Sequence, residues 1–325
     1  MRLLEIENLR VDFGHGPETI RAVDGVSLAL RSGEILGLVG ESGAGKSVTA
    51  LAVARLLPSP PARIASGQIR LQGKEVLAMT TPELRKIRGG TVSYIFQEPG
   101  ASLNPVFRIG WQIREMLRIH RPEAATEAEA VRLLKMVGIP DPERRIFSYP
   151  HELSGGMQQR AMIAIAIAAK PRLLIADEPT TALDVTIQAQ MIDLLRRLRT
   201  ELGMAILLIS HNLPLVAGLA DRVAVMYGGQ IVESGGTAEV LGHPLHPYTA
   251  ALLQSVPRLG SQRARLPAIP GPAAGTGTPP PGCRFQPRCG LAQPACSASE
   301  VELRNPFPGR AVRCRETLVL EPARK

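Results

Sequence analysis

Eight residues near the amino terminus constrain this chain more than any other stretch. Residues 40–47 read Gly-Glu-Ser-Gly-Ala-Gly-Lys-Ser, which fits the G-x-x-x-x-G-K-[ST] pattern of a phosphate-binding P-loop. Residues 34–40 form a short apolar run before the motif, and residues 48–57 favour a helix that Pro58 ends. A strand, a glycine turn and a helix are the setting in which the motif binds phosphate. The alternative, a chance glycine-rich turn, would not require these flanking elements.

The residue types of the motif suit a nucleoside triphosphate. Glycines let backbone N–H groups turn inward around phosphate oxygens, where a side chain would clash. We expect Lys46 to reach the β- and γ-phosphates and to take part in catalysis. We expect the Ser47 hydroxyl to ligate Mg²⁺. The nucleotide-contacting residues predicted from this stretch are Gly40, Glu41, Ser42, Gly43, Ala44, Gly45, Lys46, Ser47 and Val48.

Composition narrows the class of protein. A chain of 325 residues has room for one large domain or two, and 45% of its residues are hydrophobic. The longest uncharged apolar run, residues 161–169, is far shorter than the roughly 18 residues that indicate a membrane span. Acidic residues stand at the amino terminus, where a signal peptide has an apolar core. We therefore expect a cytosolic chain that can dock on a membrane protein.

The positive charge is concentrated in the tail. Residues 257–325 hold eleven Arg or Lys and four Glu, a balance of +7 out of +9 for the chain. A basic tail is typical of proteins that bind nucleic acid, anionic lipid or an anionic cofactor. All four cysteines lie in the same segment.

Hydrophobic patterning predicts an α/β fold with two kinds of sheet. Residues 3–36 alternate apolar and polar in short bursts, and 67–77 resemble a hairpin, which indicates an antiparallel sheet. Buried-type strands at 173–177 and 205–209 alternate with helical stretches, which favours a parallel sheet covered on both faces. Phe13, in the first turn, could stack on adenine or belong to the core.

Three further motifs follow the P-loop in order. Residues 153–160 read Leu-Ser-Gly-Gly-Met-Gln-Gln-Arg, residues 174–179 Leu-Ile-Ala-Asp-Glu-Pro, and residues 182–184 Ala-Leu-Asp. Together they resemble the ATP-binding cassette (ABC) ATPases over roughly residues 1–256. The resemblance implies a P-loop NTPase cassette with a RecA-like parallel sheet, an N-terminal antiparallel β subdomain and a helical subdomain at about 98–170. Residues 257–325 would form a small C-terminal extension.

The resemblance implies a role for each polar residue near the triphosphate. Asp177 would hold Mg²⁺ through water, and Glu178 would act as general base toward the attacking water. His211 would contact the γ-phosphate and orient that water. Gln97 would complete the Mg²⁺ shell beside Ser47.

The remaining motif residues imply a dimer. Ser154, Gly155 and Gly156 would form a helix N-terminus aimed at a γ-phosphate held by the opposite subunit. Asp184 would lie in the turn at the dimer interface. Met157 stands where many family members carry Gln, which fits a heterodimer with two unequal sites.

Other segments resemble the ATP-binding subunits of dipeptide and oligopeptide importers. They are residues 97–105, His246-Pro247-Tyr248, residues 256–258 and residues 282–289. This likeness implies a second, different ABC ATPase subunit, two membrane permeases, an external solute-binding protein and a location at the cytoplasmic face of the inner membrane. The region after Gln97 would lie under a permease. Nickel importers share the pattern, so the cargo stays open between peptide and nickel.

Cysteine spacing predicts a cofactor in the tail. Cys283, Cys289, Cys296 and Cys314 are separated by five, six and seventeen residues. Disulfides are rare in the cytosol, whereas four thiolates suit Zn²⁺ or an iron–sulfur cluster. Zinc sites usually contain close C-x₂₋₄-C pairs, which are absent, and the importer resemblance implies a [4Fe–4S] cluster. Four reduced, unligated thiols are the alternative.

Four arginines flank these cysteines, and we expect them to offset the negative charge of such a cluster. They are Arg284, Arg288, Arg313 and Arg315.

Two rival functions remain open. A soluble ABC ATPase could use the basic tail to bind nucleic acid, but it would usually carry a second cassette or a coiled-coil insertion. This tail also holds few of the aromatic residues that stack on bases. A non-hydrolysing scaffold would not need Lys46, Asp177, Glu178 and His211 together. We therefore expect an ATPase that powers peptide import, with no nucleic acid partner.

Overall fold

The structure is a computed structural model that describes residues 2–14, 16, 19–180, 184–256, 268–272 and 280–318. The chain divides into two compact units. Unit 1 comprises Met1–Leu3, Leu30–Glu34 and Val76–Ile209, and unit 2 comprises Leu4–Ala29, Ile35–Glu75 and Ser210–Lys325. Both units contain strands and buried apolar side chains. The domain boundary predicted at residue 256 stays a prediction.

An antiparallel sheet fills the N-terminal part of unit 2, as the alternating sequence predicts. Its four strands, in spatial order, are β2 (Ile20–Arg31), β1 (Arg2–Phe13), β4 (Ala62–Leu71) and β5 (Lys74–Glu75). Ile6 on β1 faces Ile69 on β4, and both side chains are buried. The hairpin expected at residues 67–77 is the β4–β5 pair.

The other strands of unit 2 carry the phosphate loop at one side and the tail at the other. They are β3 (Ile35–Val39), β9 (Arg222–Tyr227), β10 (Gln230–Gly236), β12 (Arg310–Val312) and β11 (Arg304–Phe307). Strands β3 and β9 are parallel, and the pairs β9–β10, β10–β12 and β12–β11 are antiparallel. The C-terminal extension therefore adds two strands to the sheet of this unit.

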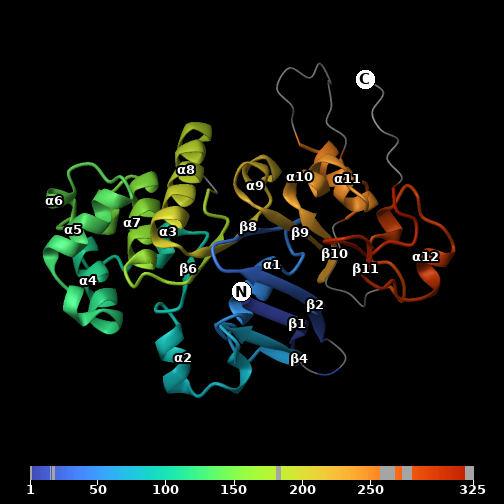
Figure 1. The fold of residues 1–325 in the computed structure, drawn as a ribbon, viewed down its shortest axis with the longest axis horizontal. Coiled ribbons are helices and arrows are strands. Elements are labelled where there is room, and N and C mark those ends of the chain that lie inside the picture. The colour runs from blue at the N-terminus through green and yellow to red at the C-terminus, as the bar shows by residue number, and fades with distance from the viewer. Residues whose placement is uncertain are drawn as a thin grey trace. The chain divides into compact units, whose positions relative to one another are not determined.

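Short helices join these strands. They are α1 (Lys46–Ala52), α9 (Leu213–Leu219), α10 (Thr237–Gly242), α11 (Pro247–Gln254) and α12 (Ala295–Ala298). A 3₁₀ turn, η5 (Gln286–Arg288), lies in the extension. Figure 1 shows α12 and the strands of the extension in red.

Unit 1 contains three parallel strands, β6 (Val92–Ile95), β7 (Leu173–Asp177) and β8 (Ala205–Ser210). In register, Leu173 of β7 lies between Val92 of β6 and Ala205 of β8. Almost every residue of these strands is buried, as expected for a parallel sheet covered on both faces.

Helices account for most of unit 1. They are α2 (Thr81–Ile87), α3 (Pro99–Ser102), α4 (Ile109–His120), α5 (Glu127–Met136), α6 (Pro142–Arg145), α7 (Gly155–Ile167) and α8 (Val185–Leu202). The helical block expected at 109–137 is two helices, because Pro122 begins a 3₁₀ turn and Thr126 caps α5. Helices α4 to α7 gather in one cluster, drawn in green in Figure 1.

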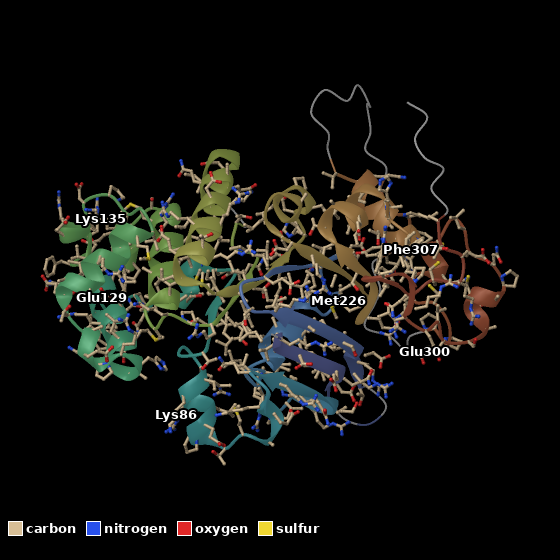
Figure 2. All side chains as sticks on the ribbon, in the orientation of Figure 1. Lys86, Glu129, Lys135, Met226, Glu300 and Phe307 are labelled. Carbon is tan, nitrogen blue, oxygen red and sulfur yellow. The ribbon has the colours of Figure 1, made fainter. Side chains whose placement is uncertain are left out.

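Charged side chains hold this cluster together at its edge. Glu129, labelled on α5 in Figure 2, accepts hydrogen bonds from Arg132 and from Arg121. Arg121 also donates to the carbonyl oxygen of Ala168, the residue that follows α7. Among the helices that the structure describes, none is long and apolar enough to cross a membrane.

Candidate functional site

The P-loop joins β3 to α1 and closes only because glycines occupy its tightest positions. Gly40 and Gly45 have φ angles of +152° and +100°. A Cβ atom at Gly40 would lie 2.1 Å from the carbonyl oxygen of Met226, and one at Gly45 would lie 2.4 Å from that of Ala22. Contacts this short with backbone exclude any side chain. The loop's path is therefore set by the neighbouring backbone of unit 2.

Lys46 lies inside the loop that it is expected to serve. Its side chain is buried, and its Nζ donates hydrogen bonds of 2.9 Å to the carbonyl oxygens of Gly40 and Glu41. Ser47 is exposed in the first turn of α1. A buried ammonium group and backbone N–H groups at one turn suit an anionic phosphate ligand.

In unit 1, the carboxyl ends of β6 and β7 bring a second set of polar residues together. Asp177 is the last residue of β7, and Gln97 follows β6 by two positions. Gln97 Nε2 donates a 3.3 Å hydrogen bond to Glu178 Oε2. Glu178 has a φ of +48°, and its backbone N–H donates to the carbonyl oxygen of Ile209. A non-glycine residue in this conformation is strained, and such strain is typical of functional sites.

Two further candidates lie at element ends in unit 2. His211 directly follows β8 and is exposed. Phe13 ends β1 and is half-buried, so the structure leaves both adenine stacking and core packing open for it.

The motif residues expected at a dimer interface begin two long helices of unit 1. Ser154 caps α7, and its Oγ accepts a hydrogen bond from the backbone N–H of Met157. Gly155 is exposed and Gly156 is half-buried in the first turn. Asp184 caps α8 in the same way, since its Oδ1 accepts from the N–H of Ile187 at 2.8 Å. Both caps are exposed, whereas residues 182 and 183 of that motif lie outside the described residues.

One residue of the 153–160 motif, Gln159, makes a contact that the sequence did not predict. Gln159 is buried on α7, and its Nε2 donates a 2.9 Å hydrogen bond to the carbonyl oxygen of Pro179. The bond ties α7 to the residue after Glu178. Its only signal in the sequence is its place in the 153–160 motif.

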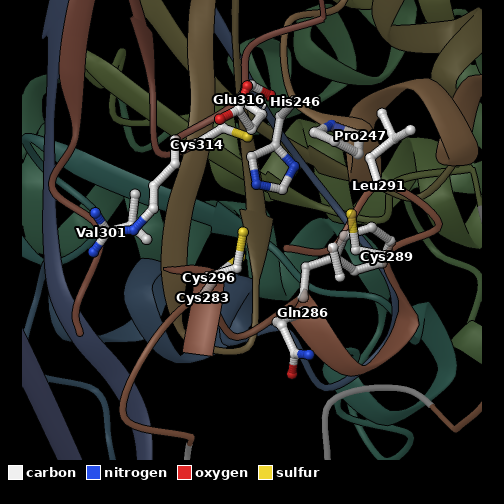
Figure 3. A pocket seen from close by; sticks show the side chains of 13 residues that line it. His246, Pro247, Cys283, Gln286, Cys289, Leu291, Cys296, Val301, Cys314 and Glu316 are labelled. Atoms are coloured by element: carbon white, nitrogen blue, oxygen red, sulfur yellow. Dashed lines mark hydrogen bonds between the residues drawn. The ribbon is translucent and has the colours of Figure 1, made fainter. Parts of the chain in front are cut away.

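The four cysteines line a single cavity in the extension (Figure 3). The backbone N–H of Cys283 donates to the carbonyl oxygen of Cys296 at 2.7 Å, and the thiol of Cys314 donates to that of Glu316 at 2.8 Å. Burial raises the pKa of Cys283 and Cys289, and raises that of Cys314 to about 11. These thiols are therefore protonated unless a cationic group binds there.

A buried histidine forms part of the same cavity. His246 Nδ1 accepts the backbone N–H of Tyr248 at 3.0 Å, which leaves the hydrogen on Nε2. Among the described residues, Nε2 is buried with no hydrogen-bond partner of good geometry, and Figure 3 shows the ring among the cysteines. Burial lowers the pKa of His246 to about 3, so the ring is neutral. A buried N–H in a wall of thiols fits a bound group that offers sulfur acceptors.

The cysteines do not converge on one point. Among the residues that the structure describes, no three His, Cys, Asp or Glu side chains come together closely enough to hold a single metal ion. The four thiols are instead distributed around the cavity wall.

The flanking arginines pair with groups other than the thiols. Arg284 donates to Asp24 and to the carbonyl oxygen of Gly228, and Arg288 pairs with Glu41. Arg313 donates to the carbonyl oxygens of Ile231 and Val301, and Arg315 to Ser299. The expectation that these arginines offset the charge of a cluster at the cysteines stays a prediction.

Two family matches cover the parts of the chain that carry these features. Residues 23–181 match the ABC transporter family, and residues 232–296 match the C-terminal region of oligopeptide/dipeptide transporters. A protein of Brucella abortus (strain 2308), named for peptide import and ATP binding, is 50% identical over 98% of this chain and 96% of its own length. The chain belongs to the ABC transporter family. Its C-terminal region is of the oligopeptide/dipeptide type.

Other relatives agree with this membership. A peptide import ATP-binding protein of Brucella ovis is 49% identical over 96% of both chains. Among solved structures, a dimeric ATP-binding cassette in a post-hydrolysis state with ADP and phosphate has a TM-score of 0.64 and 26% identity, covering 72% of this chain and 98% of its own. CbiO1 of Clostridium perfringens, part of an ABC transporter complex, has the same score and identity over 74% and 91%. The predicted cassette fold is confirmed.

Proposed function

We propose that this chain is the ATP-hydrolysing subunit of a bacterial ABC importer for dipeptides or oligopeptides. The observation that carries the proposal is its 50% identity, over nearly the full length, to proteins named for peptide import and ATP binding. That likeness includes the extension, which matches the oligopeptide/dipeptide transporter region. No described feature favours nickel or nucleic acid as the ligand of the assembly.

In the proposed ATP hydrolysis, each motif residue has a separate role. Lys46 binds the β- and γ-phosphates. Ser47, Gln97 and, through water, Asp177 would hold Mg²⁺, and the bound ion would neutralise charge on the phosphates. Glu178 accepts a proton from the attacking water. Its hydrogen bond from Gln97 supports this role, because it fixes the carboxylate at the carboxyl ends of β6 and β7.

His211 and Phe13 complete the proposed site. His211 contacts the γ-phosphate and orients the water, and Phe13 stacks on adenine. The exposure of His211 and the half-burial of Phe13 leave both side chains accessible to a ligand.

Dimerisation is part of the proposal. Ser154, Gly155 and Gly156 would meet the triphosphate of a second ABC ATPase subunit, and Asp184 would lie at the same interface. Support comes from the exposure of the α7 and α8 caps and from the dimeric state of the similar cassette. Met157 favours a heterodimer.

An exposed groove on the helical cluster, with apolar and charged side chains in its lining, supports docking to permeases. Its large apolar or aromatic side chains are those of Val106, Phe107, Trp111, Ile146, Phe147 and Tyr149, and its charged ones are those of Arg108, Arg114 and Glu127. Val106 is 70% exposed and Phe147 50% exposed, and the rings of Phe107 and Trp111 stack with centroids 4.0 Å apart. Exposed apolar patches of this kind mark interaction surfaces.

We propose that a cytoplasmic loop of each of two permeases occupies such a groove. The chain would then lie at the cytoplasmic face of the inner membrane, and the external solute-binding protein would act on it only through the permeases.

For the cysteine cavity we propose a [4Fe–4S] cluster held by Cys283, Cys289, Cys296 and Cys314. All four thiols line one cavity, and four thiolates are the ligand set that such a cluster requires. The buried Nε2–H of His246 offers a hydrogen bond to a cluster sulfur. Iron and sulfide analysis of anaerobically purified protein should find about four of each per chain. Stoichiometric zinc without iron would contradict this.

Glu178→Gln tests the proposed reaction. The variant should bind MgATP at least as well as the wild type, because the amide keeps the shape of the side chain and removes a negative charge near the phosphates. It should hydrolyse MgATP at least about 100-fold more slowly, since the general base is lost. Binding of a fluorescent ATP analogue and phosphate release by the reconstituted complex are the measurements. Normal turnover in this variant would exclude Glu178 as the base.

A further inference from the structure

A salt bridge joins the cysteine segment to the phosphate loop. Glu41, the second residue of the P-loop, receives two hydrogen bonds from Arg288, which lies 247 positions later on the turn η5. The Nη1–Oε2 and Nη2–Oε1 distances are 2.6 and 3.0 Å. The Arg288 side chain is only 6% exposed and that of Glu41 24%. A two-pronged, largely buried pair of this kind is among the stronger polar contacts in proteins.

Both partners of this pair are fixed by further contacts. Arg288 Nε donates to the carbonyl oxygen of Pro270 at 2.8 Å, Nη1 lies 3.3 Å from the hydroxyl of Tyr227, and the guanidinium lies over the Tyr227 ring. The backbone N–H of Glu41 donates to the Tyr248 hydroxyl at 2.8 Å. Glu41 is therefore held through its side chain and its backbone at once.

Folding of the cysteine segment determines where Arg288 lies. Arg288 directly precedes Cys289, and Phe285 at the start of the same turn packs against the rings of Tyr227 and Tyr248. Phe285 and Cys289 both line the cysteine cavity. The packing that organises the four thiols thus also presents Arg288 to the P-loop.

The charge on Glu41 gives this contact a consequence for phosphate binding. An unpaired carboxylate beside the P-loop would repel a triphosphate, and the repulsion is strong where water is excluded. The guanidinium neutralises that carboxylate and fixes its direction.

We propose that Arg288 is a positioning residue for the phosphate loop, through which the folded cysteine segment sets the affinity for ATP. The inference depends on the proposed role of residues 40–48 as the nucleotide site. Arg288 acts through Glu41 and does not itself contact the nucleotide.

Arg288→Met in the full-length protein is the first test. The dissociation constant of a fluorescent ATP analogue with Mg²⁺ should rise about 10-fold, as expected for loss of a charge-assisted pair. In the assembled transporter the KM for ATP should rise to a similar extent, while kcat changes less than about twofold because the reacting groups are untouched.

Arg315→Gln is the matched control. Arg315 follows Cys314 as Arg288 precedes Cys289, but its side chain bonds only to Ser299 among the described residues. Its ATP affinity should equal that of the wild type. An equal loss in both arginine variants, or an unchanged affinity in folded Arg288→Met, would overturn the proposal.

Two more variants separate positioning from a general effect on folding. Arg288→Lys keeps the charge but cannot form the two-pronged contact, so its affinity should fall about threefold with an unchanged unfolding transition. If Arg288→Met does not fold, this variant decides, and wild-type affinity in it would overturn the proposal.

The double variant Glu41→Gln, Arg288→Met should bind ATP no more weakly than Arg288→Met alone, because without arginine the carboxylate is only a repulsive charge. If the losses of ATP affinity in the two single variants simply add in the double variant, Glu41 and Arg288 act independently, and the proposed coupling between them is wrong.

Lys46→Ala separates this inference from the proposed function. If Lys46→Ala abolishes ATP binding and Arg288→Met leaves it intact, only the role of Arg288 is wrong. If Lys46→Ala binds ATP normally, the assignment of the phosphate loop is wrong as well.

Discussion

At the scale of single residues, the P-loop depends on backbone shape as much as on charge. Gly45 begins α1 in a left-handed conformation and lies against the carbonyl oxygen of Ala22 and the methyl group of Met226. Gly43 is also left-handed, but apart from its two chain neighbours no described residue has an atom within 4 Å of the position that a Cβ would occupy. Gly45 is therefore required by its backbone conformation and by its close neighbours, whereas Gly43 is required by its backbone conformation alone.

This difference predicts that substituting alanine at Gly45 and at Gly43 lowers the free energy of unfolding by different amounts. Gly45→Ala should lower the free energy of unfolding by about 3 kcal/mol or more, because strain and a backbone clash add together. Gly43→Ala should cost about 1 kcal/mol from backbone strain alone. Denaturant unfolding of the two variants is the measurement, and equal costs would show that the backbone around Gly45 can relax.

At the scale of elements, side-chain caps fix where the helices of unit 1 begin. Thr126, Ser154 and Asp184 each accept a backbone N–H from the first turn of α5, α7 and α8. The last two also belong to motifs that the family resemblance assigns to a dimer interface. Capping and partner contact can be separated experimentally.

Asp184→Ala should destabilise the isolated subunit by about 1 kcal/mol through loss of the α8 cap. Asp184→Asn keeps an oxygen acceptor and should be nearly as stable as the wild type. Thermal unfolding measures both. If Asp184→Asn nevertheless lowers ATP-dependent dimerisation, the charge has a second role at the interface; if Asp184→Ala is fully stable, the cap is not an energetic contact.

The helical cluster should show a pH-dependent contribution from Glu129. The hydrogen bond from Arg132, the charge of that residue and Arg121 hold the pKa of Glu129 below its ordinary value of 4.5. A carboxyl group with a lowered folded pKa stabilises the protein above its unfolded pKa, and the contribution is lost as pH falls through the folded pKa.

Glu129→Gln should therefore be less stable than the wild type at pH 7 by up to about 1 kcal/mol, since the pair is partly exposed. The difference should disappear well below pH 4.5, where both proteins carry a neutral group. Urea unfolding at the two pH values is the measurement. A difference that persists in acid would indicate loss of shape rather than of charge.

At the scale of the whole chain, the tail is an integral part of unit 2. Strand β12 pairs with β10, and Arg310 forms an ion pair with Glu233 at 2.9 Å. Glu233 is fully buried and also accepts the backbone N–H groups of Leu245 and His246. The ion pair thus connects the extension with the segment that leads into α11.

Arg310→Met should destabilise the protein by about 3–5 kcal/mol, because it leaves the buried Glu233 carboxylate without a cation. Arg304→Gln, which changes an exposed arginine of β11, is the control and should cost less than about 0.5 kcal/mol. Chemical unfolding followed by near-ultraviolet circular dichroism measures both. If Arg310→Met and Arg304→Gln were equally stable, the extension would contribute little to the core of unit 2.

The sequence alone determined those features whose cause is local. A glycine pattern followed by Lys46 and Ser47 predicts a phosphate-binding turn between a strand and a helix, and the apolar runs at 173–177 and 205–209 predict parallel strands. Both predictions are possible because turn geometry and hydrophobic period depend on neighbouring residues. Family motifs added the cassette fold, which the comparisons confirm.

Only the tertiary structure decided which distant side chains meet. Arg288 pairs with Glu41, His246 lines the cysteine cavity, and Gln97 donates a hydrogen bond to Glu178. Nothing in the local sequence encodes these pairings, because each arises from packing between segments 37 to 247 positions apart. Hydrophobic period fixes which face of an element is buried, but the partner of a buried charge is chosen only when the elements come together.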